Sequence, residues 1–257
     1  MVRALLIRGM LVGVVAAVFS FAVAKVLGES EVGRAIAFES AREAAEGVHG
    51  TELVPRALQN TIGLLTGLLA FGVALGGLFS LAYACAQGRL GALGARGTAA
   101  FVALAGFMGM YLVPALKYPA NPPSIGNPDT IGERTSLYFT MMLIALSVVI
   151  GGCVTARRLT ARFGAWDAAL LALAGGLVIV GLAYYLLPQV HETPDAFPAD
   201  VLWRFRVASL AINVTLWATI GLLFGALTDR ALRASAAAGS PGGRGAPGAG
   251  SLVATEA

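Results

Sequence analysis

Charged residues are scarce in this 257-residue sequence: Asp, Glu, Lys and Arg make up only 12% of it, about half the 25% that is usual for soluble domains. Hydrophobic residues make up 57%. A chain of this composition would aggregate in water, so it predicts an integral membrane protein with lipid as its surroundings. The net charge of +4 does not argue for a nucleic-acid partner, because the basic residues stand in short clusters beside apolar runs, where they set topology.

Metal-ligating side chains are also few. The two cysteines, Cys85 and Cys153, fall toward the same predicted membrane face, and a disulfide framework or thiolate cluster is not expected from them. Of the two histidines, His191 is followed by Glu192 and could offer a metal ion nitrogen and oxygen ligands. The alternative is that these residues are polar only because they lie in an exposed loop, with no metal bound.

No Lys, Arg, Asp or Glu stands near the centre of an apolar run, which argues against a proton-relay carrier and a voltage sensor. Nucleotide-binding, zinc-protease, catalytic-triad and CxxC motifs are missing too, so we expect no enzyme and no bound cofactor. The polar residues within the apolar runs are uncharged, and Asn213 is the one that stands out. An Asn in a span usually bonds to a neighbouring helix; a place on a transport pathway is the alternative.

Six apolar runs have roughly the ~20 residues that a spanning helix needs. They predict an all-α membrane domain over residues 1–233, with about six transmembrane helices arranged as helical hairpins. A disordered cytoplasmic tail is expected over 234–257, because Ala, Gly, Ser and Pro cannot bury a core. The first run also imitates a signal peptide, ending in Ala22-Val23-Ala24, but a retained helix is favoured. The spans are expected near 5–26, 61–84, 98–116, 137–156, 166–187 and 207–227.

Topology follows from the Lys and Arg residues. With both termini in the cytoplasm, ten of the 18 lie in inner segments, and these segments are nearly free of acid, so this orientation is expected. The first outer loop contains an Ala- and Glu-rich stretch, 31–46, with charges at helical spacing. It predicts a surface helix whose charged face is exposed to water. The alternative is that its carboxylates form a vestibule that attracts cations.

Two parts of the chain match at an offset of 69 residues, for example Arg89-Leu90 with Arg158-Leu159 and Pro119 with Pro188. Since the period spans two helices, the pattern indicates a possible parallel repeat, with chance as the alternative. At three places an acidic residue precedes an Arg where a predicted helix begins at the outer side of the membrane. A carboxylate at the N-terminus of a helix can cap the free backbone N–H groups. The pairs are Glu52 with Arg56, Asp129 with Arg134, and Asp200 with Arg204.

Glycines spaced four apart occur in two of the predicted spans. This spacing puts them on one helix face and permits close approach of a second helix. Tight packing within the bundle is the favoured interpretation, and a dimer face is the alternative. The pairs are Gly63 with Gly67, Gly72 with Gly76, and Gly221 with Gly225.

The stretch 117–132 is a polar loop between two apolar runs, and four of its residues are Pro. Each Pro fixes its own φ and restricts the residue before it, so we expect a loop of fixed shape. Its side-chain oxygens are candidate ligands for a cation. The candidates are Asn121, Asn127 and Asp129, set among Lys117, Tyr118, Pro119, Pro122 and Pro123.

The amino-acid sequence of this loop and its flanks resembles the CbtA family of probable cobalt transporter subunits. The segments that carry the resemblance are LVPALKYPANPP (112–123) and GNPDTIG (126–132). Residues 56–64, 72–79, 164–167 and 197–206 are similar to the same family. The resemblance implies a bacterial inner-membrane protein for Co²⁺ uptake in cobalamin synthesis, paired with CbtB, a very small His-bearing membrane partner. It covers most of the chain to about residue 232, and members are often described with five spans.

Two functions of different class follow. The first is a membrane subunit of an uptake system for a divalent cation, which the resemblance implies is Co²⁺. The loop 117–132 would supply oxygen ligands to the ion, and His191 would supply a nitrogen ligand. The second is a non-transporting scaffold or partner-binding subunit, favoured by the lack of charge within the spans. Lys117, Arg134, Arg204 and Arg206 would then fix loops that dock another protein.

Overall fold

The computed structural model describes residues 2–47, 55–123, 125–126, 130–190, 193–194 and 196–239. Within these ranges the regular structure is helical and contains no strand, as the apolar runs predict. The elements are α1 (Val2–Val23), η1 (Ala24–Gly28), α2 (Glu29–Glu46), α3 (Arg56–Leu58), η2 (Gln59–Gly63), α4 (Leu64–Ala86), α5 (Ala95–Phe107), η3 (Met108–Leu112), α6 (Val113–Lys117), α7 (Ile131–Leu186) and α8 (Ala199–Gly239), where η marks a π-helical turn.

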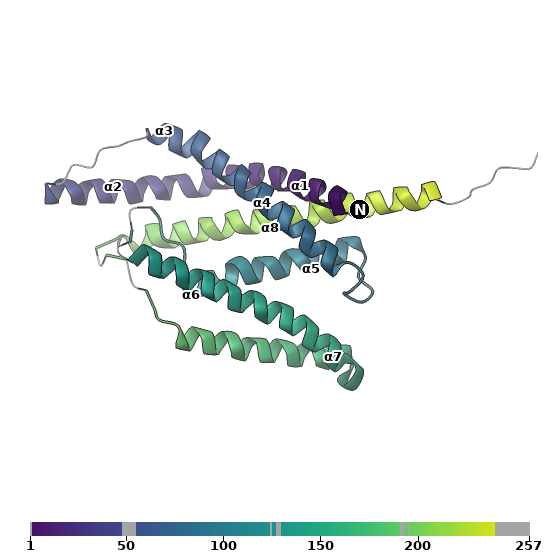
Figure 1. The fold of residues 1–257 in the computed structure, drawn as a ribbon. Coiled ribbons are helices and arrows are strands. Elements are labelled where there is room, and N and C mark those ends of the chain that lie inside the picture. Colours follow the sequence, from purple (N-terminus) through teal and green to yellow (C-terminus); the bar gives the residue numbers. More distant parts are fainter. Residues whose placement is uncertain are drawn as a thin grey trace, which may run out of the picture.

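Five of the described helices are long and apolar enough to cross a membrane. One of them, α7, has 56 residues, which at about 1.5 Å per residue is far longer than a bilayer core is thick. Gly164 interrupts it with φ 81° and ψ 165°, a conformation that favours glycine. Figure 1 shows the chain turning back there, so α7 is a helical hairpin of two crossings. The expected arrangement of about six spans is confirmed when α7 is counted as two.

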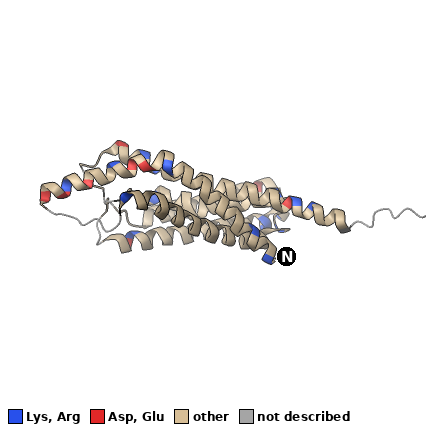
Figure 2. Ribbon diagram, turned by 90° about the horizontal axis from the view of Figure 1, so that it is seen from above, with Lys and Arg blue, Asp and Glu red and all other residues tan. Residues whose placement is uncertain are grey.

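The crossings alternate in direction and define two ends of the molecule (Figure 1). We call the end that holds Lys117 and Asp200 the loop end, and the end that holds Arg8, Arg89 and Arg157 the arginine end. Charged residues gather toward these two ends and leave the middle of the bundle uncharged (Figure 2).

The acidic stretch expected to form a surface helix is α2. It continues α1 through the π-turn η1 without a break, so one helix runs over Val2–Glu46. Its α1 part belongs to the protein core, where Val12, Ala16 and Ala17 are buried.

The core of the bundle lies between α1, α4, α5 and α8. Phe224 of α8 is fully buried, and its ring meets the rings of Phe79 and Tyr83 from α4 edge-on, with centroids 5.2 and 5.0 Å away. Edge-to-face aromatic pairs of this kind add to the stabilisation from burial. Elsewhere the spans expose large apolar side chains, as lipid-facing surfaces do.

Glycines set the distance between α1 and α4. A Cβ on Gly13 would lie 2.0 Å from the carbonyl oxygen of Gly72, and a Cβ on Gly9 would lie 2.2 Å from that of Gly76. The backbones therefore touch, as small residues at four-residue spacing allow. The predicted packing role is confirmed for Gly72 and Gly76, whose partners on α1 the sequence analysis missed.

The other two glycine pairs differ from each other. Gly221 and Gly225 of α8 face α5, where added Cβ atoms would lie 2.5 Å from the Cβ of Ala103 and 3.0 Å from that of Ala99. Around Gly67 nothing lies within 4 Å, and Gly63 meets only its own helix. The packing prediction is thus confirmed for the pair on α8 and wrong for Gly63 and Gly67.

At the loop end, buried side chains anchor the proline-rich stretch. Ile125 packs with Ala35 of α2 and Val201 of α8, and Tyr118 packs with the α7 hairpin. Pro122 is fully buried. The described part of the stretch is therefore anchored to α2, α7 and α8, and its rigidity stays a prediction from its prolines. At the other end of the chain, α8 continues to Gly239, past the boundary expected at residue 233, and residues 240–257 lie outside the described part.

Candidate functional site

A cavity of about 330 Å³ lies at the loop end between two of the π-turns, the proline-rich stretch and α8. We call it the π cavity. π-turns are rare and frequently mark functional sites, because the extra residue distorts the local backbone. Its lining consists of Ala24, Gly28, Glu29, Val32, Arg56, Gln59, Asn60, Leu64, Pro123, Phe205, Ala208, Ser209 and Ile212.

Glu29 supplies the carboxylate at this cavity. Its Oε1 accepts hydrogen bonds from Arg56 Nη2 at 2.7 Å and from Asn60 Nδ2 at 3.0 Å. Lys25 Nζ donates to the backbone oxygen of Asn60 at 3.2 Å. The Glu29 side chain is 23% exposed, and its carboxylate is held by Arg56 of α3 and Asn60 of η2.

Polar groups continue from the cavity into the spans. Ser209 lines the cavity, and its Oγ lies 3.1 Å from the hydroxyl of Tyr111 in η3. Asn213, one turn further along α8, donates from Nδ2 to the Ser209 carbonyl at 3.0 Å, and its side chain also lies beside the Tyr111 hydroxyl. We call Glu29, Asn60, Ser209, Tyr111 and Asn213 the polar file.

The neighbouring hairpin is bonded to the same π-turn. Tyr138 of α7 donates its hydroxyl hydrogen to the backbone oxygen of Met110 at 3.2 Å. A carbonyl within a π-turn is displaced from regular helical pairing, which leaves it open to an outside donor. η3 therefore connects α7 and α8 at the inner part of the polar file.

A second, larger cavity at the loop end is basic. It measures about 600 Å³, and we call it the basic cavity. Lys117 Nζ donates to the carbonyl oxygen of Tyr184 at 2.7 Å. Arg206 donates to the Ala120 carbonyl at 3.3 Å and to Asn121 Oδ1 at 3.2 Å. Its lining comprises Leu116, Lys117, Tyr118, Pro119, Asn121, Arg134, Tyr184, Gln189, Val190, Thr193 and Arg206.

The residues proposed from the sequence are dispersed over these features. Asn213 lies in the polar file, whereas Asn121 lies at the basic cavity with its oxygen already accepting from Arg206. Tyr118 donates to the carbonyl oxygen of Pro188 at 2.8 Å and so joins the two outer loops. Four further candidates, Asn127, Asp129, His191 and Glu192, lie outside the described residues.

Asp200 pairs across elements rather than along its own helix. Its Oδ2 accepts from Arg34 Nη2 of α2 at 2.7 Å. This hydrogen bond is the main cause that lowers the pKa of the Asp200 carboxyl, and the charges of Arg34 and Arg204 act in the same direction. Asp200 stands in the first turn of α8, so the expected helix-terminal position is right, but the expected partner Arg204 is exposed and makes no direct bond to it. Arg56 pairs with Glu29, and its expected partner Glu52, like Asp129 beside Arg134, lies outside the described residues.

The arginine end holds a carboxylate that the sequence analysis missed. Asp229 of α8 lies 2.9 Å from Arg96 Nε of α5 and 3.1 Å from Arg233 Nη2. Beside it, Arg8 Nη1 donates to the Thr228 hydroxyl at 3.0 Å. The signal was present in the sequence, because Asp229 is an acid next to Arg230 in a segment rich in arginine. Its role is to tie α8 to α5.

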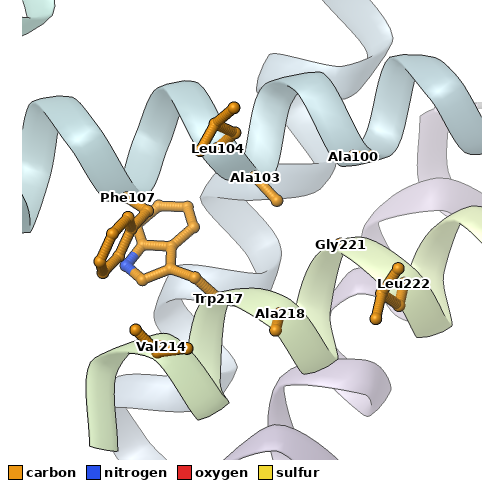
Figure 3. Close-up of a pocket in the computed structure, with 9 residues that line it drawn as sticks. All are labelled: Ala100, Ala103, Leu104, Phe107, Val214, Trp217, Ala218, Gly221 and Leu222. Atoms are coloured by element: carbon orange, nitrogen blue, oxygen red, sulfur yellow. The ribbon is translucent and has the colours of Figure 1, made fainter. Parts of the chain in front are cut away.

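An apolar cleft of about 320 Å³ lies between α5 and α8 (Figure 3). Trp217 and Phe107 lie together at one end of it, and Leu222 lies toward the other. The indole covers Gly106 so closely that a Cβ there would lie 2.3 Å from Trp217 Cζ3. Because its lining carries no polar side chain besides the indole, this cleft does not suit an ion.

No group of three or more His, Cys, Asp or Glu side chains that could hold a metal ion occurs among the described residues.

The family comparison fits this multi-pass architecture. The family model described as probable cobalt transporter subunit (CbtA) matches residues 2–229, nearly the whole chain. The chain belongs to the CbtA family. It is thus a membrane subunit of a cobalt uptake system, and the resemblance carried by residues 112–132 is confirmed. The CbtA description as a transporter subunit indicates a non-enzymatic role and implies a further subunit. No curated protein and no solved structure matches the chain significantly.

Proposed function

We propose that this CbtA subunit itself carries Co²⁺ across the cytoplasmic membrane, and that the ion moves along the polar file. The observation that carries the proposal is the continuity of the file. Glu29 and Asn60 stand at the π cavity with Ser209, and Ser209 contacts Tyr111 and lies one turn from Asn213 within the spans. A cation that leaves water needs such oxygens to replace its hydration shell.

The parts of the file serve different steps. Glu29 attracts the dication, which must compete with Arg56 for the carboxylate because the two are bonded at 2.7 Å. Arg56 therefore keeps the carboxylate occupied until an ion arrives. The hydroxyls of Ser209 and Tyr111 and the side-chain oxygen of Asn213 then offer neutral ligands, which release the ion readily.

Loop residues and a partner complete the ligand set in this proposal. Asn127, Asp129, His191 and Glu192 would gather the ion outside the membrane, and Asn121 would join them once Arg206 releases its oxygen. CbtB, the His-bearing partner implied by the family, would supply nitrogen ligands. Both termini would be cytoplasmic, because the short segments at the arginine end are rich in arginine.

Cobalt uptake by whole cells at limiting external cobalt tests the file. Cells that lack the native gene would carry the wild type, Asn213→Leu or the control Thr215→Val. The Thr215 hydroxyl bonds only to the Ala211 carbonyl of its own helix, at 2.8 Å, so its loss leaves the file intact. We expect Asn213→Leu to reduce the initial rate about tenfold, as the loss of one ligand worth ~1.4 kcal/mol would do, and Thr215→Val to transport normally. Equal rates at equal protein levels would refute the path.

A further inference from the structure

The α7 hairpin is attached to the rest of the molecule near the loop end. Its close contacts run through η3 and α6. A Cβ on Gly109 would lie 2.8 Å from Leu146 Cδ2, and the Tyr138 hydroxyl bonds to Met110. Toward the arginine end the hairpin diverges from α4 and α5 and leaves a cleft of about 540 Å³. We call it the hairpin cleft.

The walls of this cleft are apolar and come mainly from α4, α5 and α7, with Trp217 of α8 added. Leu78 of α4, Phe101 of α5 and Ile150 of α7 are among the lining residues, and Leu78 and Ile150 remain 60% and 64% exposed. Exposed apolar side chains of this size in a concave setting indicate a ligand with hydrocarbon character.

The mouth of the cleft is basic. Arg89 follows the end of α4 and Arg157 lies on the first half of α7, and both line the cleft. Arg89 donates to the carbonyl oxygen of Cys85 at 2.5 Å, a neutral acceptor, and the described residues offer no carboxylate to either arginine. Two guanidinium groups at the polar end of an apolar cleft match a phosphate attached to hydrocarbon chains.

The size of the cleft favours a lipid over a helix as its occupant. A helix with its side chains is about 10–12 Å across and rises about 5.4 Å per turn, so each turn fills roughly 500 Å³. The hairpin cleft therefore holds about one turn, which is far less than a spanning helix. Slender acyl chains can enter the same space. From the apolar walls, the size and the arginines, we infer that the hairpin cleft binds an anionic phospholipid, with its phosphate between Arg89 and Arg157 and acyl chain between α4, α5 and α7.

The inference is independent of the direction of transport and of the path taken by cobalt. It does connect with the rest of the molecule, because η3 holds both the hairpin and Tyr111. A lipid in the cleft acts as a wedge that fixes the angle of the hairpin on η3. Removing it is expected to loosen α7 without unfolding the bundle of α1, α4, α5 and α8.

Binding can be measured on the full-length chain, purified in a mild detergent, delipidated and analysed by native mass spectrometry. Phosphatidylglycerol and phosphatidylcholine with identical acyl chains are the probes. We expect phosphatidylglycerol to bind at least fivefold more strongly, and the double variant Arg89→Gln with Arg157→Gln to lose this preference. Arg162→Gln is the matched control, because Arg162 lies over the ring of Phe163 at 5.3 Å and does not line the cleft.

A second variant tests the apolar part without touching the arginines. Ala82 lines the cleft, and Ala82→Phe is expected to fill it and weaken phosphatidylglycerol binding while the melting temperature of the bundle is retained. Inorganic phosphate alone is expected to raise the melting temperature far less than the lipid. The inference is overturned by equal binding of both lipids, by unchanged binding in the double variant or in Ala82→Phe, or by phosphate acting as strongly as the lipid.

Discussion

The hydroxyl of Tyr111 lies 3.1 Å from the hydroxyl oxygen of Ser209. This contact joins the π-turn η3 to α8, and Ser209 lines the π cavity together with Glu29. It is one of the few polar side-chain contacts among the described spans.

Removing the Tyr111 hydroxyl is expected to impair transport. Tyr111→Phe keeps the ring, which packs against Phe107 with centroids 5.8 Å apart, so folding should be preserved while one ligand of the file is lost. Whole-cell cobalt uptake should fall several-fold. Tyr138→Phe is the control, since Tyr138 bonds only to a backbone carbonyl; a comparable loss in that variant would assign the effect to packing.

The contact between α1 and α4 predicts a strong steric effect at one glycine and none at another. Gly13→Val places methyl groups where the Gly72 carbonyl lies and should destabilise the protein by about 1–3 kcal/mol or more. Gly67→Val, on α4, meets open space and should change stability by less than about 0.5 kcal/mol. Unfolding in detergent, followed by circular dichroism, measures both. Similar stability of the two variants would contradict the packing.

The two outer loops are predicted to separate when one hydroxyl is removed. Tyr118→Phe deletes the 2.8 Å hydrogen bond to Pro188, which is worth about 0.5–1.5 kcal/mol. Amide hydrogen exchange at Gln189 and Val190 should become faster. Tyr185→Phe removes a hydroxyl from a side chain that is 86% exposed, and exchange there should stay as in the wild type. Unchanged exchange in Tyr118→Phe would show that other contacts hold the loops.

The pair between Arg34 and Asp200 predicts a pH dependence. Because Arg34 lowers the pKa of Asp200 in the folded protein, the pair stabilises the fold above the ordinary Asp pKa of about 3.9. That stabilisation is lost as the pH falls through the lowered value. Carboxyl NMR titration should give a midpoint below about 3.9 for Asp200, rising toward the ordinary value in Arg34→Gln. A midpoint that Arg34→Gln leaves unchanged would contradict the pair. Both groups are exposed, so the effect on stability should be small.

Much of the architecture could be predicted from the sequence, because span length and apolarity are local properties. The hairpin of α7 is an example: Arg157, Arg158 and Arg162 mark the boundary between two apolar runs, and Gly164 permits the turn. The packing of Gly72 and Gly76 was expected from their spacing, although the same spacing at Gly63 and Gly67 brings no neighbouring helix close. The partners of Gly72 and Gly76, which are Gly9 and Gly13, were not expected, since the choice of neighbouring helix depends on the tertiary arrangement.

The candidate site was predicted less well, for a physical reason. The sequence pointed to charged and metal-ligating side chains in the loops. The π cavity instead lies beside the π-turns η1 and η2, and no residue pattern predicts these backbone distortions. Glu29 lies just before the acidic stretch 31–46 and was not singled out, and neither were Asn60 and Ser209. Asn213 was identified because polar residues in apolar runs are visible without any structure.

The central claim is that this chain conducts cobalt along the polar file, and flux into proteoliposomes tests it most directly. Purified wild-type chain and Asn213→Leu would be reconstituted at equal density, with a cobalt-sensitive dye inside, each with and without the partner subunit. The account predicts cobalt-dependent quenching with the wild type and a rate about tenfold lower with Asn213→Leu. Equal rates for the two chains, or no flux by the wild type even with its partner present, would contradict it and favour a scaffold role.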